Sequence, residues 1–500
     1  MLRKVVTSFL IKPQHNGLNP ENKVLLLRRS DKVRTYPHHW AGISGSIEAG
    51  DKSPLERALN EIKEETKFTS SDVKLIRTGK PFTIRAENIS TVWKVYPFLF
   101  HLLASPDKIQ LDWEHETSQW MKPNEIYSLE NTVPRLEETF YRVYLPENVH
   151  RGLKDMCDNR SSGAQQLADQ ALGIFAESVE SRVCYEYCND ARELYLTWLN
   201  IGWHIIQIRP TMRASISCAI TSVLKQLKNS IEHKNKNALP SVEDFEKLAL
   251  DKIHEQRELS LKSNERIIDA FRKAIKIQDQ KFPENIHIMT LSYSSTIYNA
   301  LANIINSIKS SSQNPKIEIT ILESRPLNEG AVVLAQKLSS LLIDKISGDE
   351  LESVRLQIVS DASCDYFMST VTHVLLGADR IIGNDGAVIN KMGSVPLALA
   401  SKHHEKPVFV ISRTDKISAC EEAEQMEEND PKEVTAAYGN ESEKNLQSYK
   451  PVKVRNVYFE KVESSLIDHY VTENGLLKTR DIQELWEGRK TDEEIFNELQ

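Results

Sequence analysis

Residues 45–68 read GSIEAGDKSPLERALNEIKEETKF and decide the fold of the first third of the chain. We predict one helix in this stretch, over residues 54–66. On a helix, residues three and four positions apart share a face, so the carboxylates of Glu61, Glu64 and Glu65 converge. Like charges placed in this way repel each other unless a cation lies between them. A hard divalent ion such as Mg²⁺ would relieve the repulsion and position a phosphate, whereas the alternative is an acidic helix face in water.

The same stretch resembles the Nudix box, in which a Gly, five residues, a Glu and seven residues precede the motif Arg-Glu-apolar-x-Glu-Glu-x-Gly-apolar. The matching positions are Gly45, Glu61, Ile62, Glu64, Glu65 and Phe68, and the preceding WAGISGSIEAGD is similar to the loop of that family. The resemblance implies a Nudix α/β/α sandwich over residues 1–145. It also implies hydrolysis of a nucleoside-diphosphate-type small molecule with Mg²⁺ or Mn²⁺. The implied metal ligands are Glu61, Glu64, Glu65 and Glu48, and Glu61 is also an implied catalytic residue.

Three positions depart from the Nudix pattern. Asp51 replaces the first Glu and is followed by one extra residue, Asn60 replaces an Arg that orients a glutamate, and Lys67 replaces the Gly beyond the helix. An Asn donates a hydrogen bond without the charge that an Arg adds. A Lys in a left-handed cap conformation costs about 1–2 kcal/mol. The alternative to a hydrolase is therefore a Nudix module that binds or docks without turnover.

The rest of the chain divides by its pattern of strands and helices. Residues 4–145 are strand-rich, because β-branched and aromatic runs such as KVLLLRR are bounded by turn residues. A polar linker over residues 146–161 leads to a helical subdomain over 162–283, where apolar residues recur at three-to-four spacing. From 284 to 500, short strands alternate with helices, which is typical of a Rossmann-like parallel sheet with crossover helices. The predicted fold class is α/β, with a helical subdomain between the two sheet domains.

Polar and glycine-containing motifs follow several predicted strands of the C-terminal half, where ligands bind in open α/β sheets. They are TLSYSST (290–296), ESRPLNEG (323–330), GADRIIGNDGAVINKMGS (377–394) and SRTDKIS (412–418), joined by RPTM (209–212) from the helical region. Taken singly, each has a plain structural explanation, such as a helix cap or an ion pair.

The charges and hydroxyls of these motifs point to an anion site. Ser294, Ser295 and Thr296 open a predicted helix, so their hydroxyls and backbone N–H groups can cradle an anion. Asp379 directly follows a predicted strand, among several cations. Those cations are Arg209, Arg325, Lys391 and Lys416, of which the arginines can bind a phosphate by bidentate forks.

Taken together, the motifs resemble one family over about residues 150–500. It contains the alpha, beta and delta subunits of translation initiation factor 2B, methylthioribose-1-phosphate isomerase and ribose-1,5-bisphosphate isomerase. The matching motifs are TLSYSST, ESRP-x-x-EG, GADR, NK-x-G, VYFEKV and VTENG. In the isomerases a Cys and an Asp convert an aldose into a ketose. Asp379 stands at the Asp position and Ser292 at the Cys position, and a serine needs an added base because its hydroxyl is a weaker acid than a thiol.

The resemblance further implies a sugar-phosphate site that needs no cofactor. The isomerases bind phosphate with an Arg-Gly-Ala segment, and Ser162 stands here at the Arg position, with Arg160 as a nearby substitute. Cys364 follows another predicted strand, and we expect it to be a buried, inert thiol. The predicted substrate-binding residues are Gly163, Ala164, Arg209, Ser294, Ser295, Thr296, Arg325, Asn390, Lys391 and Lys416.

The composition excludes several classes of protein. The chain has 500 residues, of which 40% are hydrophobic and 27% charged, and its formal net charge is −8. This charge argues against a protein that holds nucleic acid by bulk electrostatics. The most apolar stretch, residues 194–208, is shorter than the roughly 20 residues of a membrane-spanning helix and predicts a buried helix. The N-terminus lacks a secretory pattern, so we expect the cytoplasm, with the nucleus as a second compartment and the scattered cysteines reduced.

Two classes of function remain open. One is a two-module enzyme, with a diphosphate hydrolase joined to a sugar-phosphate isomerase. The other is a regulatory protein akin to the factor 2B subunits, which senses a sugar phosphate without turnover. We expect a homo-oligomer through the C-terminal half, and neither membrane nor nucleic acid as a direct partner. The regulatory alternative instead predicts co-purification with factor 2B subunits, and a clean homo-oligomer would count against it.

Overall fold

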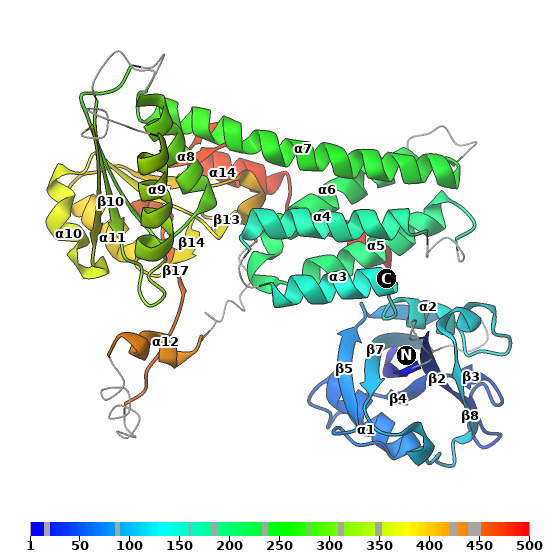
Figure 1. Cartoon of the computed structure of the whole chain (residues 1–500). Coiled ribbons are helices and arrows are strands. Elements are labelled where there is room, and N and C mark those ends of the chain that lie inside the picture. The colour runs from blue at the N-terminus through cyan, green and yellow to red at the C-terminus, as the bar shows by residue number, and fades with distance from the viewer. Residues whose placement is uncertain are drawn as a thin grey trace.

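The computed structural model describes residues 2–14, 21–85, 91–159, 162–182, 188–232, 239–277, 281–308, 315–345, 353–419, 428–438 and 452–499. Figure 1 shows three parts: a strand-rich N-terminal domain, a bundle of helices, and a C-terminal domain built on a parallel sheet. This arrangement confirms the predicted α/β fold class with a helical subdomain in the middle.

The N-terminal domain is a mixed sheet with helices on both faces. Its central strand β1 (Leu2–Gln14) pairs in parallel with β7 (Val92–Leu102) and antiparallel with β2 (Glu21–Arg29) and β4 (Ile43–Ser46). The sheet is completed by β3 (Trp40–Ala41), β5 (Val73–Thr78), β6 (Phe82–Arg85) and β8 (His115–Met121).

Side chains of β1 alternate between the two faces of this sheet, as the strand period of two requires. Val6 and Leu10 pack in the cluster that contains Ile62 of helix α1 (Pro54–Thr66). Phe9 and Ile11 pack on the other face, with residues of helix α2 (Leu136–Tyr141). The layers are therefore helix, sheet and helix, which confirms the predicted sandwich.

Helix α1 begins and ends as its sequence predicts. The Ser53 hydroxyl accepts a hydrogen bond from Glu56 N–H, and Pro54 takes the first helical position, where its missing N–H is not needed. At the other end, Lys67 adopts the left-handed conformation with φ 65°. The position that the Nudix pattern reserves for Gly is thus filled here by a residue under backbone strain.

Within the described residues, five helices form the middle of the chain around one apolar core. Part of the predicted linker is helix α3 (Glu147–Asp158), which buries Val149, Leu153 and Met156 in this core. The C-terminal turn Asp492–Leu499 also packs into the core through Ile495, Phe496 and Leu499, so the chain ends beside the helices (Figure 1). The other helices are α4 (Ala164–Glu180), α5 (Ala191–Gln207), α6 (Arg213–Glu232) and α7 (Val242–Ala274).

Helix α7 joins the helical and C-terminal domains. Its first half buries Phe245 and Ile253 in the helical core, and its last turns bury Ile267 and Phe271 against the parallel sheet. The apolar stretch 194–208 lies almost wholly in helix α5 and is largely buried, as predicted. Within the described part of the chain, no helix is both long and apolar enough to cross a membrane.

The C-terminal sheet has the strand order β11-β10-β9-β12-β15-β18-β19, with β19 as the antiparallel edge. Strand β9 again alternates, with Ile288 facing helix α8 (Ser295–Ser307) and Met289 facing helix α11 (Ser394–His403). The strands of this sheet are β9 (Asn285–Leu291), β10 (Lys316–Leu322), β11 (Val354–Val359), β12 (His373–Leu376), β15 (Val408–Ile411), β18 (His469–Thr472) and β19 (Gly475–Leu477).

A second, smaller sheet lies beyond the carboxyl edge of the parallel one. Its order is β16 (Ile417–Ser418), β13 (Arg380–Ile382), β14 (Val388–Lys391) and β17 (Phe459–Val462). The short helices α9 (Gln336–Lys345), α10 (Cys364–Phe367), α12 (Pro431–Thr435) and α14 (Thr479–Glu487) complete the domain. Because β9, β10, β12 and β15 are parallel, the residues that follow them meet at one edge.

Candidate functional site

The carboxylate of Glu61 lies directly against Gly45. A Cβ atom added at Gly45 would stand 1.3 Å from Glu61 Oε1, so a larger residue there would displace this carboxylate from its present position. The Glu61 side chain is nearly buried, and this burial raises its pKa while the neighbouring Arg57 opposes the rise. Gly45 and Glu61 of the predicted motif are therefore in direct contact in the fold.

Glu65 is the most buried of the three predicted glutamates. Ser44 N–H donates to its Oε1 at 3.1 Å, while His115 Nε2 lies 3.5 Å from Oε2, which has no hydrogen-bond partner among the described residues. Burial raises the pKa of Glu65 well above its ordinary value, and the negative charge of Glu61 adds to the rise. A buried carboxylate with an unpartnered oxygen is costly unless a cation balances it, so these residues fit a divalent metal ion.

Arg57 is a residue of this site that the motif did not reveal. Its Nε donates to Glu61 Oε1 at 2.8 Å, and its Nη2 lies 3.4 Å from Glu64 Oε2. Arg57 stands one helical turn before Glu61 and gives it the positively charged partner that Asn60 cannot provide. The i, i+4 spacing of Arg57 and Glu61 was the signal in the sequence.

Acidic residues of a second segment face the same helix. Glu114 adds negative charge near Glu61 and Glu65, and Asp112 Oδ1 lies 3.0 Å from His115 Nδ1. Burial lowers the pKa of His115, which favours its neutral form. Glu48, the fourth predicted ligand, is exposed on the loop before α1, where its N–H donates to Asp51. The structure thus adds the segment 112–115 to the site that the sequence predicted.

A second centre forms at the carboxyl edge of the parallel sheet. Asp379 follows β12, and Lys416, Lys391 and Glu329 act on it electrostatically. Burial raises the pKa of Asp379, the two lysines oppose this rise, and Glu329 adds to it. Lys416 Nζ also donates to the carbonyl of Ala378, which holds the lysine beside the turn that carries Asp379.

Ser292 contacts a residue that the sequence analysis did not single out. Its Oγ donates to Glu329 Oε2 at 2.8 Å, and Lys391 Nζ lies 2.9 Å from the same oxygen. Lys391 also lies 4.5 Å from the ring centroid of Tyr458. Glu329 belongs to the ESRPLNEG motif, but nothing local in the sequence says which residue its carboxylate meets.

Other predicted residues surround this centre. Ser294 caps helix α8 by accepting a hydrogen bond from Ile297 N–H, as predicted, and Ser295 and Thr296 form its first turn. A Cβ at Gly377 would lie 3.4 Å from Asn390 Oδ1 and 3.7 Å from Ser294 Oγ, so these two side chains flank the turn before Asp379.

The remaining predicted residues lie in other surroundings. Arg209 donates to the carbonyls of Met156 and Asn159, and Asn159 Nδ2 bonds Ser162 Oγ at 3.0 Å. Arg209 is therefore held next to the start of helix α4, where Gly163 is exposed and Ala164 buried, while Arg160 falls outside the described residues. Arg325 donates to the carbonyl of Val434 at 3.2 Å. Cys364 is buried, and desolvation raises the pKa of its thiol, in line with an inert cysteine.

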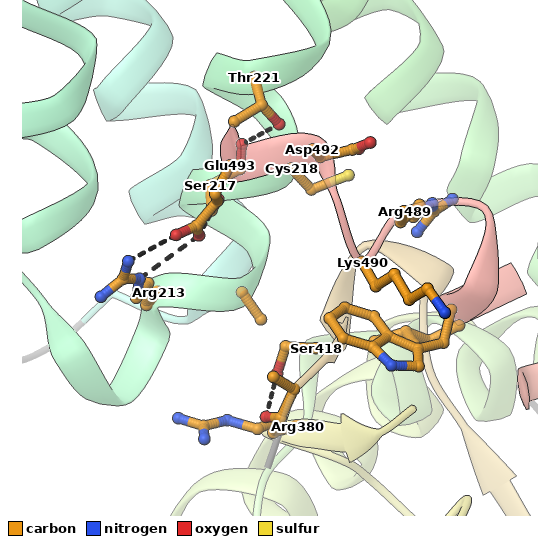
Figure 2. Close-up of a pocket in the computed structure, with 14 residues that line it drawn as sticks. Arg213, Ser217, Cys218, Thr221, Arg380, Ser418, Arg489, Lys490, Asp492 and Glu493 are labelled. Carbon is orange, nitrogen blue, oxygen red and sulfur yellow. Dashed lines mark hydrogen bonds and ion pairs between the residues drawn. The ribbon is translucent and has the colours of Figure 1, made fainter. Parts of the chain in front are cut away.

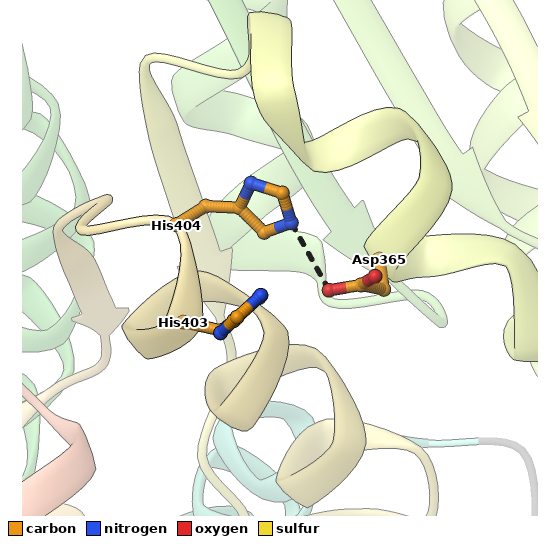
Figure 3. Close-up of side chains that lie close together, drawn as sticks. All are labelled: Asp365, His403 and His404. Atoms are coloured by element: carbon orange, nitrogen blue, oxygen red, sulfur yellow. Dashed lines mark hydrogen bonds and ion pairs between the residues drawn. The ribbon is translucent and has the colours of Figure 1, made fainter.

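Two further features lie outside the predicted sites. A cavity of about 160 Å³ is lined by residues of helix α6 and of the C-terminal segment. At its edge, Arg213 of the helix pairs with Glu493 of that segment at 2.6 Å (Figure 2). None of the predicted site residues lines it. Asp365, His403 and His404 place their ligand atoms within 4.8 Å of one another on the surface (Figure 3). The Nudix glutamates do not form so tight a group in the described structure, where Arg57 contacts both Glu61 and Glu64.

Comparison with known proteins agrees with both resemblances. Residues 161–479 match the model of the Initiation factor 2 subunit family, and residues 17–143 match that of the NUDIX domain. The ribose 1,5-bisphosphate isomerase of Archaeoglobus fulgidus is 27% identical over 277 residues, which are 55% of this chain and 74% of that protein. The methylthioribose-1-phosphate isomerase of Desulforamulus reducens is 26% identical over 246 residues, or 47% of this chain, and the match spans 64% of that protein.

Among solved structures, the translation initiation factor eIF-2B of Pyrococcus horikoshii OT3 has a TM-score of 0.46 at 22% identity, covering 68% of this chain and 100% of that one. The family match over residues 161–479 is the broader finding, because it spans more than half of the chain. The protein therefore belongs to the initiation factor 2 subunit family and carries a Nudix domain before the family region.

Proposed function

We propose that the C-terminal centre converts a phosphorylated aldose into a ketose, with a substrate of the ribose 1,5-bisphosphate or methylthioribose 1-phosphate type. The observation that carries this proposal is the environment of Asp379. Burial raises the pKa of this carboxyl, and two lysines and a glutamate face it. A carboxyl balanced in this way can give a proton to a sugar oxygen and take one back.

The surroundings of Asp379 support binding of a sugar phosphate. The N-terminus of helix α8 offers backbone N–H groups and the hydroxyls of Ser295 and Thr296, which suit an anion. Lys391 and Lys416 supply positive charge. The buried Asn390 uses its Nδ2 to donate to Ser394 Oγ at 2.8 Å, and its Oδ1 would accept from a sugar hydroxyl. Arg209, Gly163, Ala164 and Arg325 are further proposed substrate contacts.

The isomerase proposal has a direct test. Purified protein is mixed with ribose 1,5-bisphosphate or methylthioribose 1-phosphate, and the ketose product is followed. We expect turnover by the wild type and a loss of at least about 100-fold in kcat for Asp379→Asn, the usual scale of a lost general acid. Binding of both sugars without turnover would instead support a regulatory sensor, the second candidate, which is favoured by Ser292 at the position of the isomerase cysteine.

We also propose that the Nudix domain hydrolyses a diphosphate linkage with Mg²⁺ or Mn²⁺. The supporting observation is the Oε2 of buried Glu65, which has no hydrogen-bond partner among the described residues, together with the negative charge that Glu61, Asp112 and Glu114 place near it. Glu61, Glu64, Glu65 and Glu48 would hold the ion, which would supply a Lewis acid for the phosphate and an activated water. Arg57 keeps the Glu61 carboxylate in place against Gly45.

Hydrolysis is tested with a panel of nucleoside diphosphate derivatives. Release of phosphate or a nucleoside monophosphate should require Mg²⁺ or Mn²⁺ and disappear in Glu64→Gln. Glu56→Gln, on the first turn of the same helix, is the matched control and should keep the activity. Activity that persists in a chelator would contradict the proposed metal site.

The proposal includes self-association in the cytoplasm. We expect the purified chain to form a homo-oligomer through its C-terminal half. Light scattering measures its mass, and a monomer at micromolar concentration would contradict this part of the proposal. Co-purification with factor 2B subunits would favour the regulatory candidate.

A further inference from the structure

The contact between Ser292 and Glu329 gives the centre a feature that neither residue suggests alone. Ser292 Oγ donates to Glu329 Oε2 at 2.8 Å, and the serine is only 7% exposed. We propose that Glu329 is the proton acceptor that activates Ser292, so that the serine hydroxyl can act as a proton-transfer group. This inference rests on the proposed isomerisation.

The backbone around the pair is strained in a way that fixes the contact. Ser292 has φ 58° and Ser324 has φ 62°, both in the left-handed region that non-glycine residues rarely adopt. Ser292 N–H donates to Ser324 Oγ, and Ser324 N–H donates to Asp361 Oδ1 at 2.8 Å. Such strain persists only where surrounding contacts over-determine it, and it is common at active sites. Two neighbouring strand ends are thus locked together at the pair.

The position of Glu329 is set by a close approach of the backbone. The next residue is Gly330, where an added Cβ would stand 1.9 Å from the carbonyl oxygen of Leu322. The turn that carries Glu329 is therefore pressed against the end of β10. Since β10 and β9 are paired with Leu322 opposite Leu291, this turn lies beside Ser292.

Titratable groups from three elements lie near Glu329. Lys391 of β14 lies 2.9 Å from its Oε2, Asp379 follows β12, and Tyr458 precedes β17. Lys391 balances the charge of a Glu329 carboxylate, and Tyr458 in turn contacts Lys391 through its ring. Burial favours the protonated form of Asp379, and in the proposed step this residue is the proton donor.

The proposed step balances without an oxidant. In a cyclic sugar 1-phosphate, the Ser292 hydroxyl accepts the C2 proton while its own proton moves to Glu329. The C–H electron pair becomes the C1–C2 double bond, the bond between C1 and the ring oxygen breaks, and protonated Asp379 gives its proton to that oxygen. Asp379 then takes the proton of the C2 hydroxyl, C1 takes a proton from Ser292, and Glu329 returns one to the serine. The net change is the aldose-to-ketose conversion.

The test compares Glu329→Gln with Ser292→Cys/Glu329→Gln on ribose 1,5-bisphosphate across a range of pH. We expect Glu329→Gln to lower kcat by about 10²–10⁴-fold with little change in KM, the scale of general base catalysis. In the double variant the thiol ionises without a base, so kcat should recover at least tenfold and rise with pH through the thiol range near about 8.5. A purely structural role for Glu329 would not produce this new pH dependence.

The control variant is Glu463→Gln, because Glu463 also pairs with a lysine, Lys461 at 3.3 Å, but is exposed and away from the centre. It should keep the wild-type kcat. If Glu329→Gln does not fold, Ser292→Ala replaces it and must show the same loss of kcat with substrate binding retained by calorimetry.

The outcomes separate this inference from the proposed function. Turnover that is lost in Asp379→Asn but kept in Glu329→Gln would overturn the inference and leave the isomerase standing. Loss in Glu329→Gln without recovery by Ser292→Cys would also overturn it. A wild type that binds the sugar phosphate without turnover removes the isomerase, and the inference falls with it.

Discussion

Replacing Glu65 by Gln measures whether the Nudix domain needs a cation at its buried carboxylate. Glu65 is 3% exposed, Ser44 N–H donates to its Oε1, and its Oε2 has no hydrogen-bond partner among the described residues. A buried polar atom left without a partner costs about 1–3 kcal/mol. The amide of Gln keeps an oxygen for Ser44 and removes the charge. Its N–H group takes the place of Oε2, 3.5 Å from Nε2 of the neutral His115, which can accept a hydrogen bond. We therefore expect metal-free Glu65→Gln to be more stable than the wild type by about 1–3 kcal/mol at pH 8.

The pH dependence of this difference has a definite sign. Burial raises the pKa of Glu65 well above its ordinary value of 4.5. Between the ordinary pKa of the unfolded chain and the raised pKa of the folded protein, the folded protein binds more protons at Glu65 than the unfolded chain does. The stability of the wild type therefore falls as the pH rises through this range. Each unit of pKa shift corresponds to about 1.4 kcal/mol. The stability of Glu65→Gln does not depend on pH through this group. The variant should therefore exceed the wild type in stability only slightly near pH 4.5, and the difference should grow toward alkaline pH.

A divalent metal ion should make the wild type more stable than Glu65→Gln. At one hundred times its Kd, an ion that binds only the folded state adds about 2.7 kcal/mol. The wild type should gain this stability from Mg²⁺, and Glu65→Gln should gain little. Hydrogen exchange of peptides from helix α1 in the full chain, with chelator or with Mg²⁺, reports the local stability. A Glu65→Gln protein that is less stable than the wild type in chelator, or that Mg²⁺ protects equally, would refute the reasoning.

Three further substitutions test neighbouring features. Gly45→Ala places a Cβ 1.3 Å from Glu61 Oε1, so it should cost about 1–3 kcal/mol in a melting experiment and abolish Mg²⁺ binding by titration; unchanged binding would contradict the steric argument. Lys67→Gly relieves a left-handed backbone with φ 65° and should stabilise the domain by about 1 kcal/mol, measured as a raised midpoint in urea. Burial lowers the pKa of His204 to about 3, so the stability that the neutral imidazole contributes is lost as the pH falls below 6.5. The carbonyl of Arg142 lies 2.7 Å from His204 Nε2. Hydrogen exchange of the backbone near Arg142 should therefore become faster below pH 6.5 in the wild type and not in His204→Gln.

Local patterns in the sequence predicted the elements well because each pattern depends on neighbours along the chain. Helix α1 spans Pro54–Thr66, the range that its sequence pattern predicted. The alternation in β1 and the hydroxyls that open α8 were likewise readable, since strand faces and helix caps involve residues only a few positions apart. The polar appearance of residues 146–161 did not reveal helix α3, which is amphipathic and buries a narrow apolar stripe in the helical core.

The sequence alone determined which chemical groups the protein has: a glycine before a helix with three glutamates, a serine at the position of a cysteine, and an aspartate and several lysines in motifs that follow strands. Tertiary structure decided which of them meet. Ser292 and Glu329 are 37 positions apart and come into contact because β9 and β10 pair in parallel and in register. Arg209 is engaged instead by carbonyls at the end of α3. Periodicity records which side of an element is apolar, whereas the order and register of strands, on which distant contacts depend, arise only when the whole core is packed.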